Sequence, residues 1–85
     1  MDSLRVGLGR AIRDLRRAHH LSQERLAIAA GIHRSFVFRM ERGEVNVSLG
    51  TLQRLAQPLG VSISDLLTRA EGFSESAERH APELA

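Results

Sequence analysis

Gly31 joins two short amphipathic patterns, and this junction limits the possible fold more than any other feature of the chain. Before it, Leu26, Ala27 and Ala30 recur at the spacing of one helical face. After it, residues 34–42 form a second pattern that stops at Gly43. Because glycine readily adopts the positive φ that ends a helix, the sequence predicts two short helices with a sharp turn at residue 31.

A first helix is predicted upstream of this pair. Its apolar residues recur at i, i+3, i+4 and i+7, at Leu8, Ala11, Ile12 and Leu15. Ser3 is a candidate cap, but Gly7 and Gly9 weaken the opening turns. We therefore expect a helix from Leu8 that ends near residue 18 or 19.

Two more helices are predicted downstream. Ser48 is a suitable N-cap for a fourth helix, and Pro58 must end or kink it near Ala56 because proline cannot donate to the helix ladder. Ser62 or Ser64 is expected to cap a fifth helix. No convincing strand alternation occurs, so the predicted class is an all-α domain of five helices around one small core.

The domain is expected to span residues 4–70, followed by an acidic C-terminal tail over residues 71–85. This tail loses the helical pattern and has only Phe73 and Leu84 as large apolar residues, so we expect it to be frayed or disordered, or to form one extra helical turn near Ser76. Eleven arginines against six carboxylates give residues 1–70 a net charge of +5, whereas one arginine against four glutamates gives the tail −3. The basic body favours a polyanionic partner.

Several classes of function are excluded by what the sequence lacks. Without cysteine there is no disulfide, thiolate metal site or cysteine nucleophile. No glycine-rich phosphate loop or nucleophile motif occurs, so we expect no enzymatic activity and no cofactor. His19 and His20 have no carboxylate or histidine partner at i+4 within one predicted helix, since Glu24 lies in the next helix, so no metal site is expected. No apolar run approaches a signal or transmembrane segment, which predicts a soluble cytoplasmic protein without membrane contact.

The outward face of the third predicted helix carries the residues expected to contact DNA bases. A helical wheel places Phe36, Val37 and Met40 on the inner side, and the opposite side is polar and basic with one exposed ring. Arginine matches O6 and N7 of guanine in the major groove, serine bonds several bases, and an apolar group can touch the thymine methyl. The predicted base-reading residues are Arg34, Ser35, Phe38 and Arg39. For Phe38 an alternative stays open, namely an exposed ring that rests on arginine side chains.

Residues 8–67 resemble a Cro/CI-type (XRE-family) helix-turn-helix domain of the lambda-repressor-like fold. The segments LSQERLA, AAGI and MERG stand at the family's spacing, and NVSLGTLQRLAQPLGVSISDLL is similar to its fourth and fifth helices. Within the family, HRSF, ERG and NVSL look closest to the small controller proteins of restriction–modification systems. The resemblance implies a sequence-specific DNA-binding transcriptional regulator, for example a repressor.

The resemblance also implies roles for single residues. Arg16 and Glu41 match a partly buried ion pair that ties the first helix to the end of the third. Gln23 would contact phosphate or brace the third helix, and Arg42 and Asn46 would lie near phosphate in the following loop. With Ser22 at the start of the second helix and His33 at the entry to the third, the residues expected at the DNA backbone are Ser22, Gln23, His33, Arg42 and Asn46.

Four positions depart from the family's pattern. His33 stands where Ser or Thr usually caps the third helix, which leaves the start of that helix less well secured. Phe38 replaces a small or polar residue, and Pro58 falls where the fourth helix normally continues. Val45 stands where controller proteins tend to carry a basic residue, which lowers the expected number of phosphate contacts.

A homodimer is predicted because one such domain covers only a short half-site. Twofold dimers bind half-sites about 34–36 Å apart and therefore prefer pseudo-palindromes. The apolar surplus near the fifth helix suggests an interface formed by Leu59, Val61, Ile63 and Leu66, with Phe73 as a further candidate. Alternatively, these residues only complete the core of the monomer.

Double-stranded DNA is the expected partner, and two further partners are considered. Activation of transcription would need a surface that touches RNA polymerase, such as Glu44 or Asp65. The rival interpretation is an antitoxin or a protein-interaction module with the same fold, whose acidic tail and Phe73 contact a toxin.

Overall fold

The computed structural model describes the backbone of residues 3–80 and the side chains of residues 3–75. Five helices follow one another: α1 (Ser3–Ala18), α2 (Gln23–Ala30), α3 (Arg34–Glu41), α4 (Leu49–Ala56) and α5 (Ile63–His80). No strand occurs within residues 3–80, so the predicted all-α class is confirmed. None of these helices has the length and apolar character needed to span a membrane.

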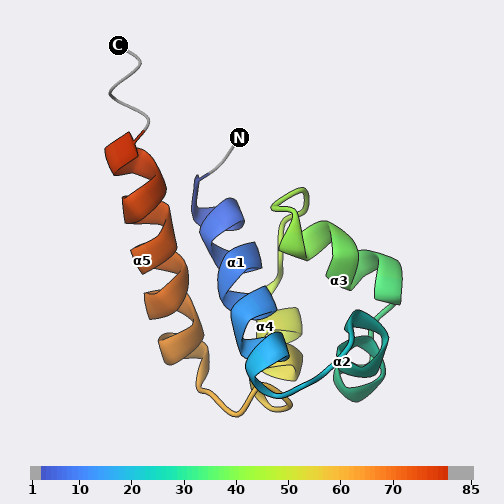
Figure 1. Cartoon of the computed structure of the whole chain (residues 1–85). Coiled ribbons are helices and arrows are strands. Elements are labelled where there is room, and N and C mark those ends of the chain that lie inside the picture. Colours follow the sequence, from blue (N-terminus) through green and yellow to red (C-terminus); the bar gives the residue numbers. More distant parts are fainter. Residues whose placement is uncertain (1–2, 81–85) are drawn as a thin grey trace.

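Helix α1 lies between the other long helix and the pair of short helices. Figure 1 shows α5 along one side of α1 and α3 on the other, with α2 beside α3. The core fills the space between them, and its largest fully buried side chains are Ile12, Leu26, Val37, Met40, Leu55, Leu59 and Leu66. This arrangement fixes the position of α3 through α1 and α2, because α3 packs against both of them.

The short helices begin and end where local chemistry predicts. The side chain of Ser22 accepts a hydrogen bond from the amide of Arg25, and Ser48 caps α4 by accepting from Thr51. Gly31 has φ 69° and ends α2 in the left-handed conformation. These caps and turns satisfy backbone groups that the helix ends leave without partners. The predicted sharp turn between α2 and α3 is confirmed.

Helix α1 begins at Ser3, earlier than the glycines at its start suggested. A Cβ atom on Gly7 would collide with the carbonyl oxygen of Ala70 and lie 2.9 Å from the amide nitrogen of Ser74. A Cβ atom on Gly9 would collide with the carbonyl oxygen of Met40. The glycines therefore allow α1 to approach both α5 and α3 closely, and this packing offsets their low helix propensity.

The predicted tail from residue 71 is wrong for residues 71–80, which continue α5. Ser74 is buried and donates a hydrogen bond to the hydroxyl of Ser3 at 3.0 Å, and the guanidinium of Arg10 lies 4.9 Å from the ring centroid of Phe73. Ala70, Phe73 and Ser74 continue one helical face, which is the signal that the sequence interpretation missed. Helix α5 therefore runs past the expected domain boundary at residue 70, while residues 81–85 lie outside the described part of the chain.

Two of the four residues predicted at the dimer interface belong to the core of the monomer. Leu59 and Leu66 are both 0% exposed, so neither offers surface to a partner. Both belong to the hydrophobic core, and Leu66 lies on α5, which packs along α1. Val61 and Ile63 are half-buried and keep part of their side chains at the surface.

Candidate nucleic-acid interface

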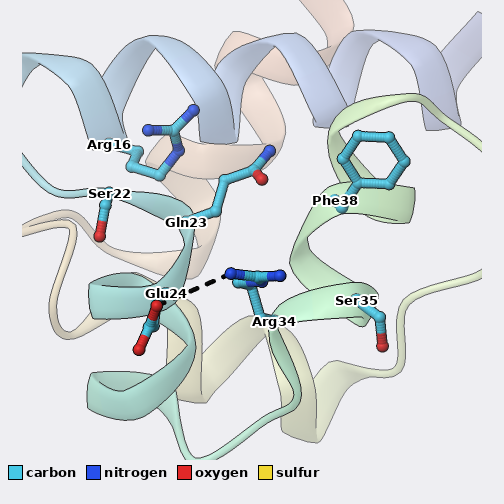
Figure 2. A pocket seen from close by; sticks show the side chains of 7 residues that line it. All are labelled: Arg16, Ser22, Gln23, Glu24, Arg34, Ser35 and Phe38. Carbon is cyan, nitrogen blue, oxygen red and sulfur yellow. Dashed lines mark ion pairs between the residues drawn. The ribbon is translucent and has the colours of Figure 1, made fainter.

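The N-terminal ends of α2 and α3 border a hollow of about 550 Å³. We call it the α2–α3 hollow; it is lined by Arg16, Ser22, Gln23, Glu24, Arg34, Ser35 and Phe38. Figure 2 shows these side chains with Arg34 extended across the middle of the hollow. The structure therefore brings together residues that the sequence analysis expected at DNA bases and at the DNA backbone.

Helix α3 has one buried and one exposed side. Val37 and Met40 are at most 2% exposed, whereas the four predicted base-reading residues lie at the surface. We call these four the reading face: Arg34, Ser35, Phe38 and Arg39. The inward position predicted for Val37 and Met40 is confirmed, and contact of the reading face with bases stays a prediction.

Arg34 is held loosely by Glu24 across the hollow. Its Nη1 atom lies 3.7 Å from Oε2 of Glu24, and both side chains are about two-thirds exposed. An exposed ion pair of this kind contributes less than about 1 kcal/mol. Arg34 is therefore oriented toward the hollow without being withdrawn from a ligand that enters it.

A part-buried network fixes α3 to the rest of the fold. Arg16 Nε donates to Oε2 of Glu41 at 2.6 Å, and Nη2 donates to Oε1 at 3.0 Å. The remaining guanidinium nitrogen, Nη1, donates to the carbonyl oxygen of Leu21 at 2.8 Å. The hydrogen bond to Glu41 raises the pKa of Arg16, although burial acts in the opposite direction. The ion pair implied by the family resemblance is present.

Gln23 braces the same network. Its Nε2 atom donates to Oε1 of Glu41 at 3.1 Å, which links the first residue of α2 to the last residue of α3. Of the two roles implied for Gln23, the structure shows the bracing one. Its contact with phosphate stays a prediction.

Phe38 and Arg42 lie against each other at the C-terminal side of the reading face. The guanidinium carbon of Arg42 is 5.5 Å from the ring centroid, and 48% of Phe38 is exposed. Arg42 Nε also donates to Oε2 of Glu44 at 2.8 Å. The structure therefore shows the ring resting on an arginine, while its exposed edge leaves contact with a thymine methyl as a prediction.

His33 lies at the entry to α3, whereas Asn46 lies away from the α2–α3 hollow. His33 is the N-cap of α3 and makes no capping hydrogen bond with its side chain, as its departure from the family pattern suggested. Asn46 is exposed and lines a separate hollow with residues of α1, α4 and α5. The structure does not bring Asn46 together with the α2–α3 hollow.

Arg13 and Arg17 are surface residues that the sequence interpretation missed. They lie one turn apart on α1 and line a hollow beside Phe38 and Arg42. Their spacing indicated an outward face of α1, but not that this face adjoins α3. In the described part of the chain, no group of three or more histidine or acidic side chains is placed to hold a metal ion.

The family model described as Helix-turn-helix (HTH_3) matches residues 12–66, which is more than half of the chain. The chain belongs to this helix-turn-helix family. The matched segment of this helix-turn-helix protein contains α2, α3 and α4 and both sides of the Arg16–Glu41 pair. Members of this family are DNA-binding transcriptional regulators, and the resemblance to the XRE-family type is confirmed.

Two relatives of known type show to which members of the helix-turn-helix family the chain is similar. The control protein C.SmaI of Serratia marcescens is 45% identical over 62 residues, which cover 73% of this chain and 74% of that protein. The crystal structure of the restriction–modification controller protein C.AhdI from Aeromonas hydrophila superposes with a TM-score of 0.71 at 44% identity, covering 73% of this chain and 94% of that one. The similarity to controller proteins predicted from the sequence is confirmed.

The similarity extends over α5 in a third protein. The clp gene regulator ClgR from Corynebacterium glutamicum superposes with a TM-score of 0.84 at 29% identity. That match covers 95% of this chain and 88% of the ClgR chain. The fold of nearly the whole chain is thus shared with a solved clp gene regulator.

Proposed function

We propose that this protein binds a pseudo-palindromic operator as a homodimer, with α3 in the major groove, and so controls transcription from a nearby promoter. The observation that carries the proposal is the outward exposure of Arg34, Ser35, Phe38 and Arg39 on a helix anchored by Val37 and Met40. A rigidly anchored helix with a polar outer face is what major-groove recognition requires.

The chemistry of the reading face supports recognition of specific bases. Arg34 projects into the α2–α3 hollow from the first turn of α3, the part of a recognition helix that usually lies deepest in the groove. A bidentate arginine–guanine pair contributes about 1–3 kcal/mol of discrimination. Ser35 follows Arg34, and Phe38 and Arg39 lie one turn farther along α3.

Contacts to phosphate would position this face. Ser22 and Gln23 lie at the start of α2 beside Arg34, and His33 precedes α3. Arg42 follows α3 and is about 60% exposed despite its bond to Glu44. Such contacts set the register of a protein on DNA without selecting a sequence.

The proposed homodimer uses the surface around Val61 and Ile63. Both side chains remain partly exposed in the turn before α5 and at its start. The proposed interface therefore contains two of the four residues predicted from sequence, because Leu59 and Leu66 are buried in the core.

The rival role as an antitoxin or protein-interaction module loses its main support. Phe73, which suggested a toxin-binding tail, lies on α5 and packs against Arg10 of α1. The acids considered for contact with RNA polymerase form exposed pairs with arginines, Glu44 with Arg42 and Asp65 with Arg69, and such weak pairs leave them accessible. Repression by occupancy needs no surface beyond the reading face, so we propose it, with no catalytic step.

The test is a footprint on the DNA upstream of the protein's own gene, followed by equilibrium binding to the protected site and to random DNA. We expect a protected inverted repeat. Arg34→Ala should reduce the preference for the site by about ten-fold or more, because a base contact is lost. Arg42→Ala should weaken binding to both DNAs similarly and reduce the slope of log K against log salt concentration by about 1.8, which is about 0.9 for each protomer of the dimer. Equal losses on both DNAs with Arg34→Ala would overturn the base-reading role.

A further inference from the structure

A second hollow of about 270 Å³ lies between α1 and the C-terminal end of α3. We call it the α1–α3 hollow. Arg13 and Arg17 from α1, Gln23 from α2, and Phe38 and Arg42 from the end of α3 line it. The part-buried pair Arg16–Glu41 completes the lining. No role assigned above uses this hollow as a whole.

The charges around the α1–α3 hollow do not balance. Arg16 is neutralised by Glu41, and Arg42 is bonded to Glu44. Arg13 and Arg17 are exposed, and neither forms an ion pair within the described part of the chain. Two guanidinium groups one helical turn apart are therefore left to attract an anion from outside.

The α1–α3 hollow adjoins the proposed DNA-binding surface. It shares Arg16, Gln23 and Phe38 with the α2–α3 hollow. In Figure 2, Phe38 stands at the edge of the α2–α3 hollow that faces α1. A DNA duplex with α3 in its major groove carries a phosphate backbone along each side of that groove, so one backbone would pass close to these arginines.

We propose that Arg13 and Arg17 bind a phosphate of the DNA backbone in the α1–α3 hollow, and that Phe38 separates this phosphate from the bases. The proposal rests on the proposed function, because it needs α3 in the major groove. Arginine suits the task because its planar fork donates two hydrogen bonds to phosphate oxygens. The ring of Phe38 offers no hydrogen bond, so it forms an apolar wall between two polar sites.

The loop after α3 offers little to a phosphate at this place. Val45 is uncharged, and Asn46 lines a separate hollow. Arg13 and Arg17 supply positive charge on the α1 side of α3 instead.

The test compares two double variants that remove the same charge. Arg13→Gln/Arg17→Gln empties the α1–α3 hollow of its unpaired guanidinium groups. Arg54→Gln/Arg69→Gln is the matched control, since both arginines are exposed and line neither hollow. Binding to the operator and to random DNA is measured by fluorescence anisotropy between about 50 and 200 mM salt, the range in which phosphate contacts dominate the dependence. Thermal unfolding checks that all variants stay folded.

We expect Arg13→Gln/Arg17→Gln to reduce the salt slope by about 1–2 on both DNAs, because each lost phosphate contact removes about 0.9. The preference for the operator over random DNA should be unchanged, and the control should keep the wild-type slope to within about 0.5. Equal slopes for the two double variants would overturn the proposal. A changed base preference in Arg13→Gln/Arg17→Gln would overturn it as well, because these residues would then contact bases.

The two proposals fail in different ways. If the wild-type protein showed no preference for any upstream site, the proposed function would fall. Random DNA would still report on phosphate contacts, so the slope comparison would remain decisive for Arg13 and Arg17. If the wild-type protein still preferred the operator while both double variants had the same salt slope, only the proposal of the phosphate site would be overturned.

Discussion

Arg16 and Glu41 meet through both carboxylate oxygens, with N–O distances of 2.6 and 3.0 Å, and so join α1 to the last residue of α3. Their side chains are only 11% and 5% exposed. Gln23 adds a third hydrogen bond from the start of α2. Since the reading face lies on α3, this pair sets the position of the predicted base-reading residues relative to the rest of the protein.

Glu41→Ala should therefore destabilise the protein by about 3 kcal/mol, because it leaves the Arg16 guanidinium part-buried without its carboxylate. Urea unfolding followed by circular dichroism measures this loss. Arg69→Ala breaks the exposed pair with Asp65 and should cost less than about 0.5 kcal/mol. Arg16→Met/Glu41→Leu should recover most of the stability, since an apolar pair needs no charge compensation. A Glu41→Ala variant as stable as Arg69→Ala would contradict the role of the pair.

Gly7→Ala should destabilise the fold by about 2 kcal/mol, although alanine is the better helix former. The added methyl group would collide with the carbonyl oxygen of Ala70 and force α1 away from α5. Gly72→Ala is the control, because a Cβ there meets nothing within 4 Å. That substitution should stabilise α5 by about 0.5–1 kcal/mol. Thermal unfolding distinguishes the two, and a stabilising Gly7→Ala would contradict the close packing of α1 on α5.

Phe38 should contact a thymine methyl with the part of its ring that is exposed. Replacing thymine by uracil throughout the operator should then weaken binding of the wild-type protein by about three-fold or more, because a buried methyl group contributes about 0.8 kcal/mol. Phe38→Ala should bind both operators equally. Competition binding measures the ratio. If the wild-type protein also failed to distinguish the two operators, the ring would serve only as the packing partner of Arg42.

Ile63→Arg should convert a dimer into a monomer, because a charged side chain would have to be desolvated in the proposed apolar interface. Light scattering after size-exclusion chromatography measures the mass at micromolar concentration. Ser64→Arg places the same charge on a neighbouring exposed residue and should leave the dimer intact. A monomeric wild-type protein would remove the basis for a two-half-site operator.

Sequence alone determined the features that depend on neighbouring residues. Ser22, Ser48 and Gly31 mark helix ends, because caps and left-handed turns satisfy backbone groups within a few residues. Pro58 ends α4 near Ala56 for an equally local reason. The 3.6-residue period also separated Val37 and Met40 from the reading face on α3.

Only the tertiary structure decided which helix faces pack against one another. Leu59 and Leu66 looked available for a dimer, but both are buried in the core of the monomer. Gly7 looked like a weak helix start, but it allows α5 to approach α1. Residues 71–80 looked like a tail, yet they extend α5 along α1. Periodicity shows that one face of a helix is apolar or basic, but the partner of that face comes from a segment distant in sequence. For the same reason, only the fold placed Arg13 and Arg17 beside Phe38.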